Sequence, residues 1–417
     1  MKAVVIARYG GPEALEYRTV PDPVPGDDDV LVQVSSIGVN YHDVYNRTGT
    51  YAIQLPFVPG RELAGTIVAV GAKVEGYAVG DRVATVDVPS PGAYAERVVV
   101  PACRAVPVPP AVSLETAAAV LLQGLTADYL SRITFPIKPG DVAVVHAAGG
   151  GTGVLLTQMV RARGGRVVAT VSDPAKIELV REMGAEEVIC RTETDFDKEV
   201  HRITDGAGAA VVYDSIGRDT FEQSLASLGR RGHLVLYGKS GGLIKSCDLH
   251  SLGPLGSLTV HVPMLPDYIA SPHELADSAA ALFHLVLRGA LRLHIGGRFP
   301  LAEARAAHAA LESRRSTGKL LLTVSDDAGH AADRPMEDLF DVLVDGEGRR
   351  SLWPKATEAP RGWTRTAEVV DRADLKIIAM AASRVGAGPV SRAGVRVSGP
   401  GSPRDGSVPA PGARGAR

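Results

Sequence analysis

The sequence predicts an α/β protein with a β-rich first part, a doubly wound sheet and a small third part. Three observations support this prediction. Short β-branched runs fill residues 1–122, strand-like and helix-like stretches alternate over residues 123–262, and the composition changes after Val324. A length of 417 residues leaves room for two or three domains.

Residues 1 to about 122 are expected to be all-β, with a change to a helix pattern at about residue 113. The apolar run at the N-terminus is too short for a signal peptide and is typical of a strand. A helix is expected to follow, with Ser113 as its N-cap and Glu115 in its first turn. Turns containing Pro-Gly, Val-Gly-Asp and Ser-Pro-Gly separate four further strands, at Val30–Ser35, Thr66–Val70, Arg82–Val86 and Tyr94–Val100.

Residues 141–173 read as a strand, a glycine-rich turn, an amphipathic helix and a second strand. Such a βαβ unit brings backbone N–H groups at a helix N-terminus to a dinucleotide's pyrophosphate. The turn fits the variant pattern Ala148-x-Gly150-x-x-Gly153 instead of the strict three-glycine pattern. A tight strand-to-helix turn without a ligand is the alternative interpretation.

The alternation of strands and helices continues through residue 262, and two helices and a strand follow it. Buried strands are expected at Val211–Asp214 and His233–Tyr237, with helices at Lys176–Met183 and Phe221–Leu228. Residues 263–324 follow this part and bring amphipathic helices near Glu274–Arg288 and Leu301–Ser313, then a strand, Lys319–Val324.

Composition and charge exclude several classes of protein. A net charge of −2 gives no reason to expect binding to nucleic acid or to a membrane surface. No stretch is long and apolar enough to span a bilayer. The cysteines, Cys103, Cys190 and Cys247, are far apart in the sequence, which favours a reducing compartment over disulfides. The expected location is therefore the cytoplasm.

Residues 325–335 are expected to form a polar linker, and a small module follows at residues 336–375. The module holds both tryptophans of the chain, Trp353 and Trp363. Residues 376–417 have few large apolar side chains and cannot bury a core, so we expect a disordered tail.

Residues 1–324 resemble the zinc-free quinone oxidoreductases of the medium-chain dehydrogenase/reductase superfamily. The resemblance implies a GroES-like catalytic domain made of residues 1–122 and 263–324, a Rossmann domain at 123–262, and an active-site cleft between them. It rests on motifs that occur in family order, namely Gly11-Pro12-Glu13, Gly38-Val39-Asn40, Pro59-Gly60-x-Glu62-x-x-Gly65, Val79-Gly80-Asp81-Arg82-Val83, Gly124-Leu125-Thr126, His146–Gly153, Val212–Gly217 and Leu311-Glu312-Ser313.

No metal is expected. Zinc members of the superfamily hold a Lewis-acidic ion with cysteine and histidine ligands. Asn40 stands in the usual cysteine place and Arg61 in the usual histidine place, and the closely spaced cysteines of the structural zinc lobe are absent from the sequence. Amide and guanidinium groups are poor zinc ligands, and His42 alone is more often a hydrogen-bonding residue.

NADPH is the expected cofactor. An acidic residue at the end of the second strand favours NAD, but Val171 and Ser172 stand there. Lys176 and Arg191 offer cations to a 2′-phosphate, although Lys176 also fits a solvated helix position. The resemblance, with the glycine-rich turn, gives as cofactor-binding residues Asn40, Thr126, Tyr129, Gly150, Gly151, Gly153, Ser172, Lys176, Arg191, Ser215, Tyr237 and Lys239.

The resemblance implies hydride transfer from NADPH to a quinone, and Tyr45, Arg47 and Tyr51 match pocket residues of the family. The phenol rings would stack on a planar substrate, and Arg47 would stabilise negative oxygen charge. Alternatively Tyr45 only packs and Arg47 pairs with Asp43. A second reaction, reduction of an enoyl or alkenal C=C bond with Tyr45 as proton donor, stays open. Relatives are commonly homodimers joined at an edge strand, here 256–263.

The third part resembles an MbtH-like protein, a small partner of adenylation domains in nonribosomal peptide synthetases. The resemblance rests on Ser351-Leu352-Trp353-Pro354 and Pro360-x-Gly362-Trp363, with a hairpin expected from Val342–Val344 and Ser351–Trp353. It implies that Ser351, Trp353 and Trp363 contact an adenylation domain. Arg349 replaces the usual glutamine and the family's closing helix is missing, so a truncated, inactive relic is the alternative.

Overall fold

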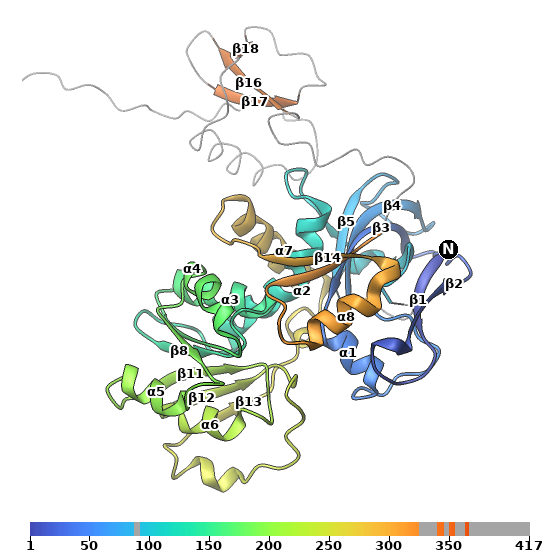
Figure 1. Cartoon of the computed structure of the whole chain (residues 1–417). Coiled ribbons are helices and arrows are strands. Elements are labelled where there is room, and N and C mark those ends of the chain that lie inside the picture. The colour runs from blue at the N-terminus through green and yellow to red at the C-terminus, as the bar shows by residue number, and fades with distance from the viewer. Residues whose placement is uncertain (87–91, 325–339, 346–349, 355–362, 367–417) are drawn as a thin grey trace, which may run out of the picture. The chain divides into compact units, whose positions relative to one another are not determined.

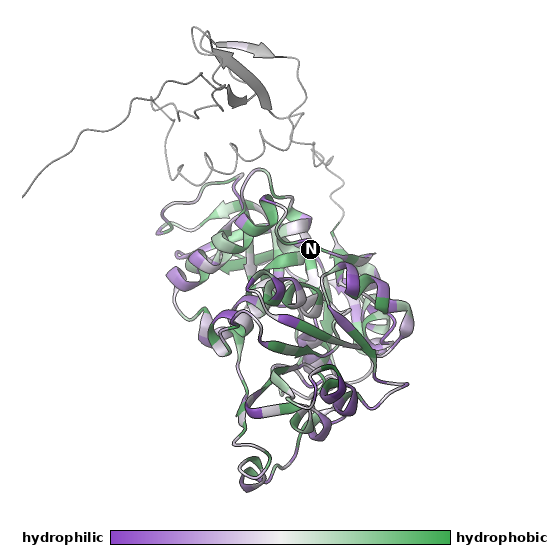
Figure 2. Cartoon of the chain, turned by 90° about the vertical axis from the view of Figure 1, so that its left-hand side faces the viewer, coloured by the Kyte–Doolittle hydropathy of each residue, from purple (hydrophilic) through white to green (hydrophobic). Residues whose placement is uncertain are grey.

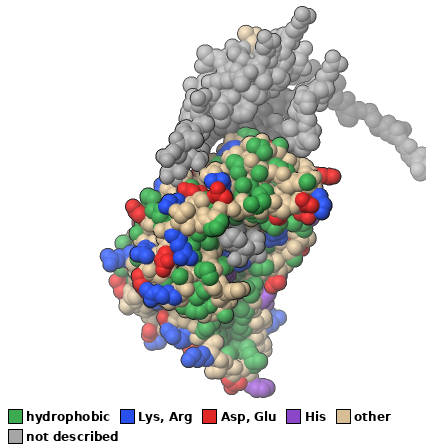
Figure 3. Space-filling view, turned by 90° about the vertical axis from the view of Figure 1, so that its right-hand side faces the viewer, with side chains coloured by type: hydrophobic (Ala, Val, Ile, Leu, Met, Phe, Trp, Pro, Cys, Tyr) green, Lys and Arg blue, Asp and Glu red, His purple; other side chains and the backbone are tan. Residues whose placement is uncertain are grey.

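A computed structural model describes residues 1–86, 92–324, 340–345, 350–354 and 363–366, shown in Figure 1. The described residues fall into two compact units, Met1–Asp333 and Arg334–Arg417. None of the described helices is long and apolar enough to cross a membrane. On the face of the first unit drawn in Figure 3, acidic and basic side chains are interspersed, in keeping with a net charge of −2.

A seven-stranded sheet organises the β-rich part of the first unit. Its pairs are antiparallel except for β14 and β15, which run parallel. The strands follow the order β14-β15-β3-β4-β5-β7, with β6 also paired to β3. The bounds are β3 Asp29–Val39, β4 Glu62–Val70, β5 Arg82–Val86, β6 Arg97–Pro101, β7 Val106–Pro107, β14 Ile295–Pro300 and β15 Lys319–Thr323, beside a separate hairpin of β1 Lys2–Ile6 and β2 Leu15–Thr19.

One helix interrupts the segment that the sequence predicted to be all-β. Helix α1 (Tyr41–Thr48) follows β3 directly, and Asp43 Oδ2 accepts a hydrogen bond of 2.9 Å from the N–H of Asn40 at its N-cap. Gly49 ends the helix in the left-handed conformation, with φ of 75°. The pattern Asn40-x-x-Asp43 is a variant of the capping box and marks this helix in the sequence.

A six-stranded parallel sheet forms the second part of this unit, in the order β10-β9-β8-β11-β12-β13. Alternate residues point to opposite faces, so that Val145 joins the core beneath α3 and Val144 joins the core beneath α5 and α6. The elements are β8 Val142–Val145, α3 Gly151–Ala162, β9 Arg166–Val171, α4 Ile177–Glu182, β10 Glu187–Cys190, α5 Phe196–Ile203, β11 Ala209–Asp214, α6 Phe221–Ala226, β12 Leu228–Leu236 and β13 Thr259–His261.

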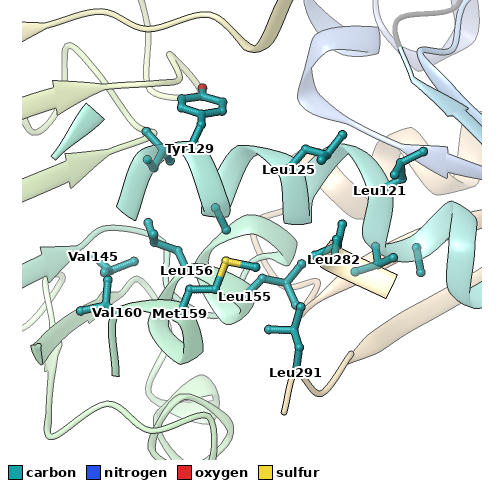
Figure 4. Close-up of a cluster of buried hydrophobic side chains, with 14 of the residues drawn as sticks. Leu121, Leu125, Tyr129, Val145, Leu155, Leu156, Met159, Val160, Leu282 and Leu291 are labelled. Carbon is teal, nitrogen blue, oxygen red and sulfur yellow. The ribbon is translucent and has the colours of Figure 1, made fainter. Parts of the chain in front are cut away.

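Helix α2 (Leu114–Tyr129) connects the two sheets and is the centre of the largest apolar core. Ser113 caps it by accepting a hydrogen bond of 2.9 Å from the N–H of Thr116, as predicted. Figure 4 shows Leu155, Leu156 and Met159 of α3 and Leu282 of α7 (Pro272–Leu287) beside α2, with Leu121 and Leu125 on another side of the same helix. The helix is continuous through residue 122, so both parts of the unit share one element.

The predicted elements between residues 140 and 324 are present with shifted ends. Helix α6 stops at Ala226, because Leu228 already belongs to strand β12. The stretch after Asp173 begins with a 3-10 turn, Pro174–Lys176, before α4. Helix α8 (Ala304–Glu312) then leads to β15. The buried strands of this unit are mostly hydrophobic in Figure 2, whereas its helices mix both colours.

The second unit contains a three-stranded antiparallel sheet in the order β17-β16-β18. Strand β16 (Phe340–Asp345) pairs with β17 (Arg350–Pro354) so that Leu343 lies opposite Ser351, which confirms the predicted hairpin. Strand β18 (Trp363–Thr366) pairs on the other side of β16. The predicted linker and tail lie outside the described residues.

Candidate active site between the two sheets

One cavity of about 550 Å³ lies where the carboxyl ends of β8, β9, β11 and β12 meet α1 and α2. This is the position at which open α/β sheets bind ligands. All of the predicted cofactor-binding residues line it, as do Tyr45 and Tyr51, whereas Arg47 does not. These lining residues are Asn40, Tyr45, Tyr51, Thr126, Tyr129, Gly150, Gly151, Gly153, Ser172, Lys176, Arg191, Ser215, Tyr237 and Lys239.

The glycine-rich turn forms a cradle at the start of α3. A Cβ atom on Gly153 would lie 2.5 Å from the carbonyl oxygen of Ala147, so only glycine fits there without backbone movement. The first helical hydrogen bond runs from the N–H of Val154 to the oxygen of Gly150, so the N–H groups of residues 151–153 lack helical partners and lie at the cavity. These donors and the helix dipole suit a pyrophosphate.

Cationic groups gather around the ends of β9 and β10. Ser172 and Arg191 follow these strands, and Lys176 and Arg314 complete the same region of the cavity lining. Burial lowers the pKa of Lys176, whose Nζ donates to the carbonyl oxygens of Arg314 and Ser316 at 2.6 and 2.7 Å. Because Val171 replaces an acidic residue, this donor set fits a dinucleotide with a 2′-phosphate.

Aromatic side chains enclose the other end of the cavity. The rings of Tyr45 and Tyr51 meet edge to face with centroids 5.4 Å apart, and the His42 ring lies 5.0 Å from that of Tyr51. The backbone N–H of Lys239 donates to the Tyr45 hydroxyl at 3.0 Å. Burial raises the pKa of Tyr45, so its hydroxyl stays protonated at neutral pH. Flat π faces of this kind suit a planar ring.

The prediction that Arg47 lines the substrate pocket is wrong. Positions 45 and 47 lie about 200° apart around a helix, so both cannot face one cavity. The Arg47 side chain is fully buried and donates to the Gly10 oxygen (3.1 Å), to His308 Nδ1 (3.1 Å) and to Glu312 Oε1 (2.7 Å). It therefore anchors α1 to α8 instead of facing a substrate, and its partner is Glu312, not Asp43.

A buried ion pair between Glu62 and Lys319 adjoins Asn40, the residue that the sequence analysis placed at the usual cysteine position of the zinc enzymes. The Lys319 ammonium contacts Glu62 Oε1, Asn40 Nδ2 donates to the same oxygen at 2.9 Å, and Lys319 also donates to Asn40 Oδ1 at 3.0 Å. The N–H of Leu122 donates to Glu62 Oε2 at 2.9 Å. Within the described part of the chain, no three His, Cys, Asp or Glu side chains cluster as a metal site would require.

Several site residues escaped the sequence analysis. Gln123 Nε2 lies 3.4 Å from Asn40 Oδ1, and Lys319 and Arg314 reach the site from residues far along the chain. Gln123 stands next to the Gly124-Leu125-Thr126 motif, a signal that could have identified it. Lys319 carried no such signal, because its role depends on pairing between β15 and β3. The predicted contact residues Ser351, Trp353 and Trp363 lie on β17 and β18 of the second unit.

Comparison with known proteins agrees with this architecture. Residues 26–110 match the family of alcohol dehydrogenase GroES-like domains, and residues 151–281 match the zinc-binding dehydrogenase family. The quinone oxidoreductase of Pseudomonas aeruginosa is 42% identical over 322 residues, covering 77% of this chain and 99% of that protein. The 2-haloacrylate reductase of a Burkholderia species is 36% identical over 327 residues, covering 77% and 98%.

Solved structures give the same result. The Escherichia coli quinone oxidoreductase complexed with NADPH has a TM-score of 0.76 and 37% identity, and the match covers 78% of this chain and all of that one. The residues around the cavity have the chemistry that such a cofactor requires. The chain belongs to the quinone oxidoreductases of the medium-chain dehydrogenase/reductase superfamily.

Proposed function

We propose that this protein is an NADPH-dependent quinone oxidoreductase that works without zinc. The observation that carries the proposal is a single cavity with a phosphate cradle and cations at one end and tyrosine rings at the other. When bound, NADPH supplies a hydride, and a solvent proton completes reduction of the quinone to the hydroquinone. A metal is not needed to polarise a quinone that accepts hydride readily.

The chain's own residues bind and orient the reactants. The N–H groups of the glycine turn hold the pyrophosphate, and Lys176 and Arg191 hold the 2′-phosphate. Tyr129 lines the cavity while its ring stacks on that of Tyr268 at 4.1 Å and 8°, which fixes this part of the cavity wall. Tyr45 and Tyr51 position the quinone, and their rings keep water from its face.

The test is NADPH oxidation by the full chain with benzo-, naphtho- and phenanthrenequinone. We expect turnover with these quinones, a lower KM for NADPH than for NADH, and no loss of activity after dialysis against a chelator. A KM for NADH equal to or below that for NADPH, or a stoichiometric metal in elemental analysis, would contradict the proposal.

Reduction of a conjugated C=C bond is the second candidate reaction. The Tyr45 hydroxyl accepts a hydrogen bond from Lys239 N–H, which leaves its own proton available to a substrate. The resemblance to a 2-haloacrylate reductase points the same way. A panel of 2-enals and enoyl thioesters beside the quinones distinguishes the reactions, because Tyr45→Phe should slow C=C reduction much more than quinone reduction.

We further propose that the second unit is an MbtH-like module that binds an adenylation domain of a peptide synthetase. The three-stranded antiparallel sheet, with tryptophans in two of its strands, supports this proposal. The test is co-purification of the full chain with an adenylation domain, and its loss on Trp353→Ala. Absence of binding by the intact chain would favour the truncated relic.

The assembly and the domain limits are also proposals. We assign residues 1–122 and 263–324 to the catalytic domain, 123–262 to the cofactor domain, and the protein to the cytoplasm.

Strand β13 lies at the edge of the parallel sheet, with Leu255, Val262 and Met264 exposed nearby, so we propose that it joins two subunits. Light scattering should show a dimer, and Thr259→Pro should shift it toward the monomer.

A further inference from the structure

An exposed apolar margin borders the cavity. Most of the residues that line the cavity are buried or half-buried. Leu243, Val262 and Met264 also line it, but they are 50%, 66% and 52% exposed, and we call these three residues the apolar margin. A side chain that faces both a cavity and solvent lies where the cavity opens. Exposed apolar side chains that gather at such an opening are typical of a binding surface.

Two segments of the chain form the apolar margin. Residues 262–266 read Val-Pro-Met-Leu-Pro, five apolar residues in succession, and all five line the cavity. Leu243 comes from the connection between β12 and β13, and its neighbour Ile244 also lines the cavity. Ile244 and Val260 of β13 pack against the same apolar core. This packing anchors both segments to the same face of the parallel sheet.

The register of the sheet places the apolar margin beside the tyrosine rings. The parallel pairing of β12 with β13 ends at His261. The segments that follow the last pair, 236–239 and 262–264, therefore leave the sheet side by side. The first of these segments ends at Lys239, whose backbone N–H donates to the Tyr45 hydroxyl at 3.0 Å. A ring held at the tyrosine end of the cavity is thus within reach of the apolar margin.

The dinucleotide is expected to end before it reaches the apolar margin. In the sheet order β10-β9-β8-β11-β12-β13, the cations of the 2′-phosphate region follow β9 and β10, and the glycine-rich turn follows β8. The nicotinamide half then belongs at the ends of β11 and β12. Strand β13 is the next strand outward, so the apolar margin is left to a group that extends from the acceptor ring toward solvent.

We propose that the physiological acceptor is a quinone with an aliphatic side chain, whose ring lies against Tyr45 and Tyr51 while its side chain covers the apolar margin. This proposal rests on the proposed function and specifies its substrate class. Methylene groups that leave water for these apolar side chains strengthen binding through the hydrophobic effect. The aliphatic group does not react, and it serves to anchor and orient the ring for hydride transfer.

The first experiment uses the full chain at saturating NADPH with 2-methyl-1,4-naphthoquinones that carry a 3-ethyl, 3-butyl or 3-hexyl group. The length of a saturated alkyl group hardly changes the redox potential of the ring, so the series isolates the contacts of the alkyl group. We expect kcat/KM to rise roughly two- to fourfold for each methylene that the apolar margin covers. A kcat/KM that does not depend on the length of the alkyl group would overturn the proposal.

Variants of the apolar margin test where the alkyl group binds. In Val262→Ser and Met264→Ser, the ratio of kcat/KM for the 3-hexyl quinone to that for the 3-ethyl quinone should fall roughly threefold, because less apolar surface is covered. Leu249→Ser is the matched control and should keep the wild-type ratio. Leu249 is apolar and 70% exposed, but it is not among the described residues that line the cavity. An unchanged ratio in both margin variants would contradict the proposal.

Light scattering separates the apolar margin from the proposed subunit contact, because Val262 and Met264 also lie near strand β13. The margin variants should keep the oligomeric state of the wild type. Dissociation into monomers, with equal losses of kcat/KM for the 3-ethyl and 3-hexyl quinones, would overturn the proposal in favour of a subunit contact.

A binding measurement separates the proposal from the proposed reaction. Calorimetry of the full chain with NADP⁺ compares 4-ethylphenol with 4-hexylphenol, neither of which accepts a hydride. We expect 4-hexylphenol to bind more tightly, and Val262→Ser to reduce the difference. If this result is obtained but none of the quinones turns over, the apolar margin is supported and the proposed reaction is rejected. Equal affinities for the two phenols would count against the apolar margin itself.

Discussion

Arg191 is the residue that most directly tests the preference for NADPH. Arg191→Ala should raise the KM for NADPH roughly 10-fold, about 1.4 kcal/mol, because one cation at the 2′-phosphate is lost. The KM for NADH should stay within about twofold. Steady-state kinetics with both cofactors measure this, with Arg202→Ala on the surface of α5 as the control. Parallel increases for both cofactors would show that Arg191 has a general role.

Arg47 should matter for stability and not for hydride transfer. Arg47→Met removes three donors and leaves Glu312 and the Gly10 oxygen without them. Loss of a largely buried charge pair lowers the free energy of unfolding by on the order of 2–4 kcal/mol. Because Glu312 is partly exposed, we expect a loss in the lower half of that range. We expect an apparent Tm lower by roughly 5 °C and an unchanged kcat.

Thermal unfolding and turnover of the same sample test this separation. Arg132→Met, which breaks a surface pair with Asp128, should lower Tm by less than about 2 °C. A large drop in kcat at temperatures where the Arg47→Met protein is still folded would show that Arg47 contributes to catalysis.

At the scale of elements, α8 carries a pH-sensitive contact with α1. Arg47 donates to His308 Nδ1, so the neutral ring donates from Nε2 to the Tyr94 hydroxyl at 3.0 Å. Burial and the charge of Arg47 lower the pKa of His308 to about 3. The unfolded chain takes up this proton near pH 6.5 and the folded chain does not, so folding loses stability as the pH falls from about 6.5 to about 3.

His308→Gln should weaken that dependence. The amide keeps a donor and an acceptor but does not titrate, so the difference in Tm between pH 7 and pH 5 should be smaller than in the wild type. Differential scanning calorimetry at both pH values measures it. Identical differences in the two proteins would assign the acid sensitivity to other groups, among them His42.

Elements with strong periodicity were predictable, and contacts between distant strands were not. The βαβ unit and the cap at Ser113 follow local rules, and each is present. Helix α1 was missed because its eight residues lie among strands. The pocket role of Arg47 was taken from the family resemblance, and the helix would have shown that residues 45 and 47 face different sides. The pair of Glu62 and Lys319 joins residues 257 positions apart, and only the sheet register brings them together.

At the scale of the whole molecule, the described site lies entirely within the first unit. A chain of residues 1–333 should therefore reduce quinones with kcat/KM within about twofold of the full chain, if it folds to the same Tm. Kinetics and calorimetry on the two proteins measure this. A large loss of activity in a well-folded truncated protein would show that residues 334–417 contribute to the site.

The continuous helix α2 also sets the mechanics of the cleft. Its first half packs on β3, β4 and β5, its side packs on α3, and Leu122, Gln123, Thr126 and Tyr129 line the cavity. Because this one helix packs against both sides of the cavity, a relative motion of the two sides would be a rotation about the axis of α2, and not a translation along that axis. Residues 262–266 line the cavity on the second passage of the chain between the two sheets. Rotation of the walls about α2 would therefore change the width of the cavity at this margin more than at the glycine-rich turn, which is held close to α2 by the packing of α3.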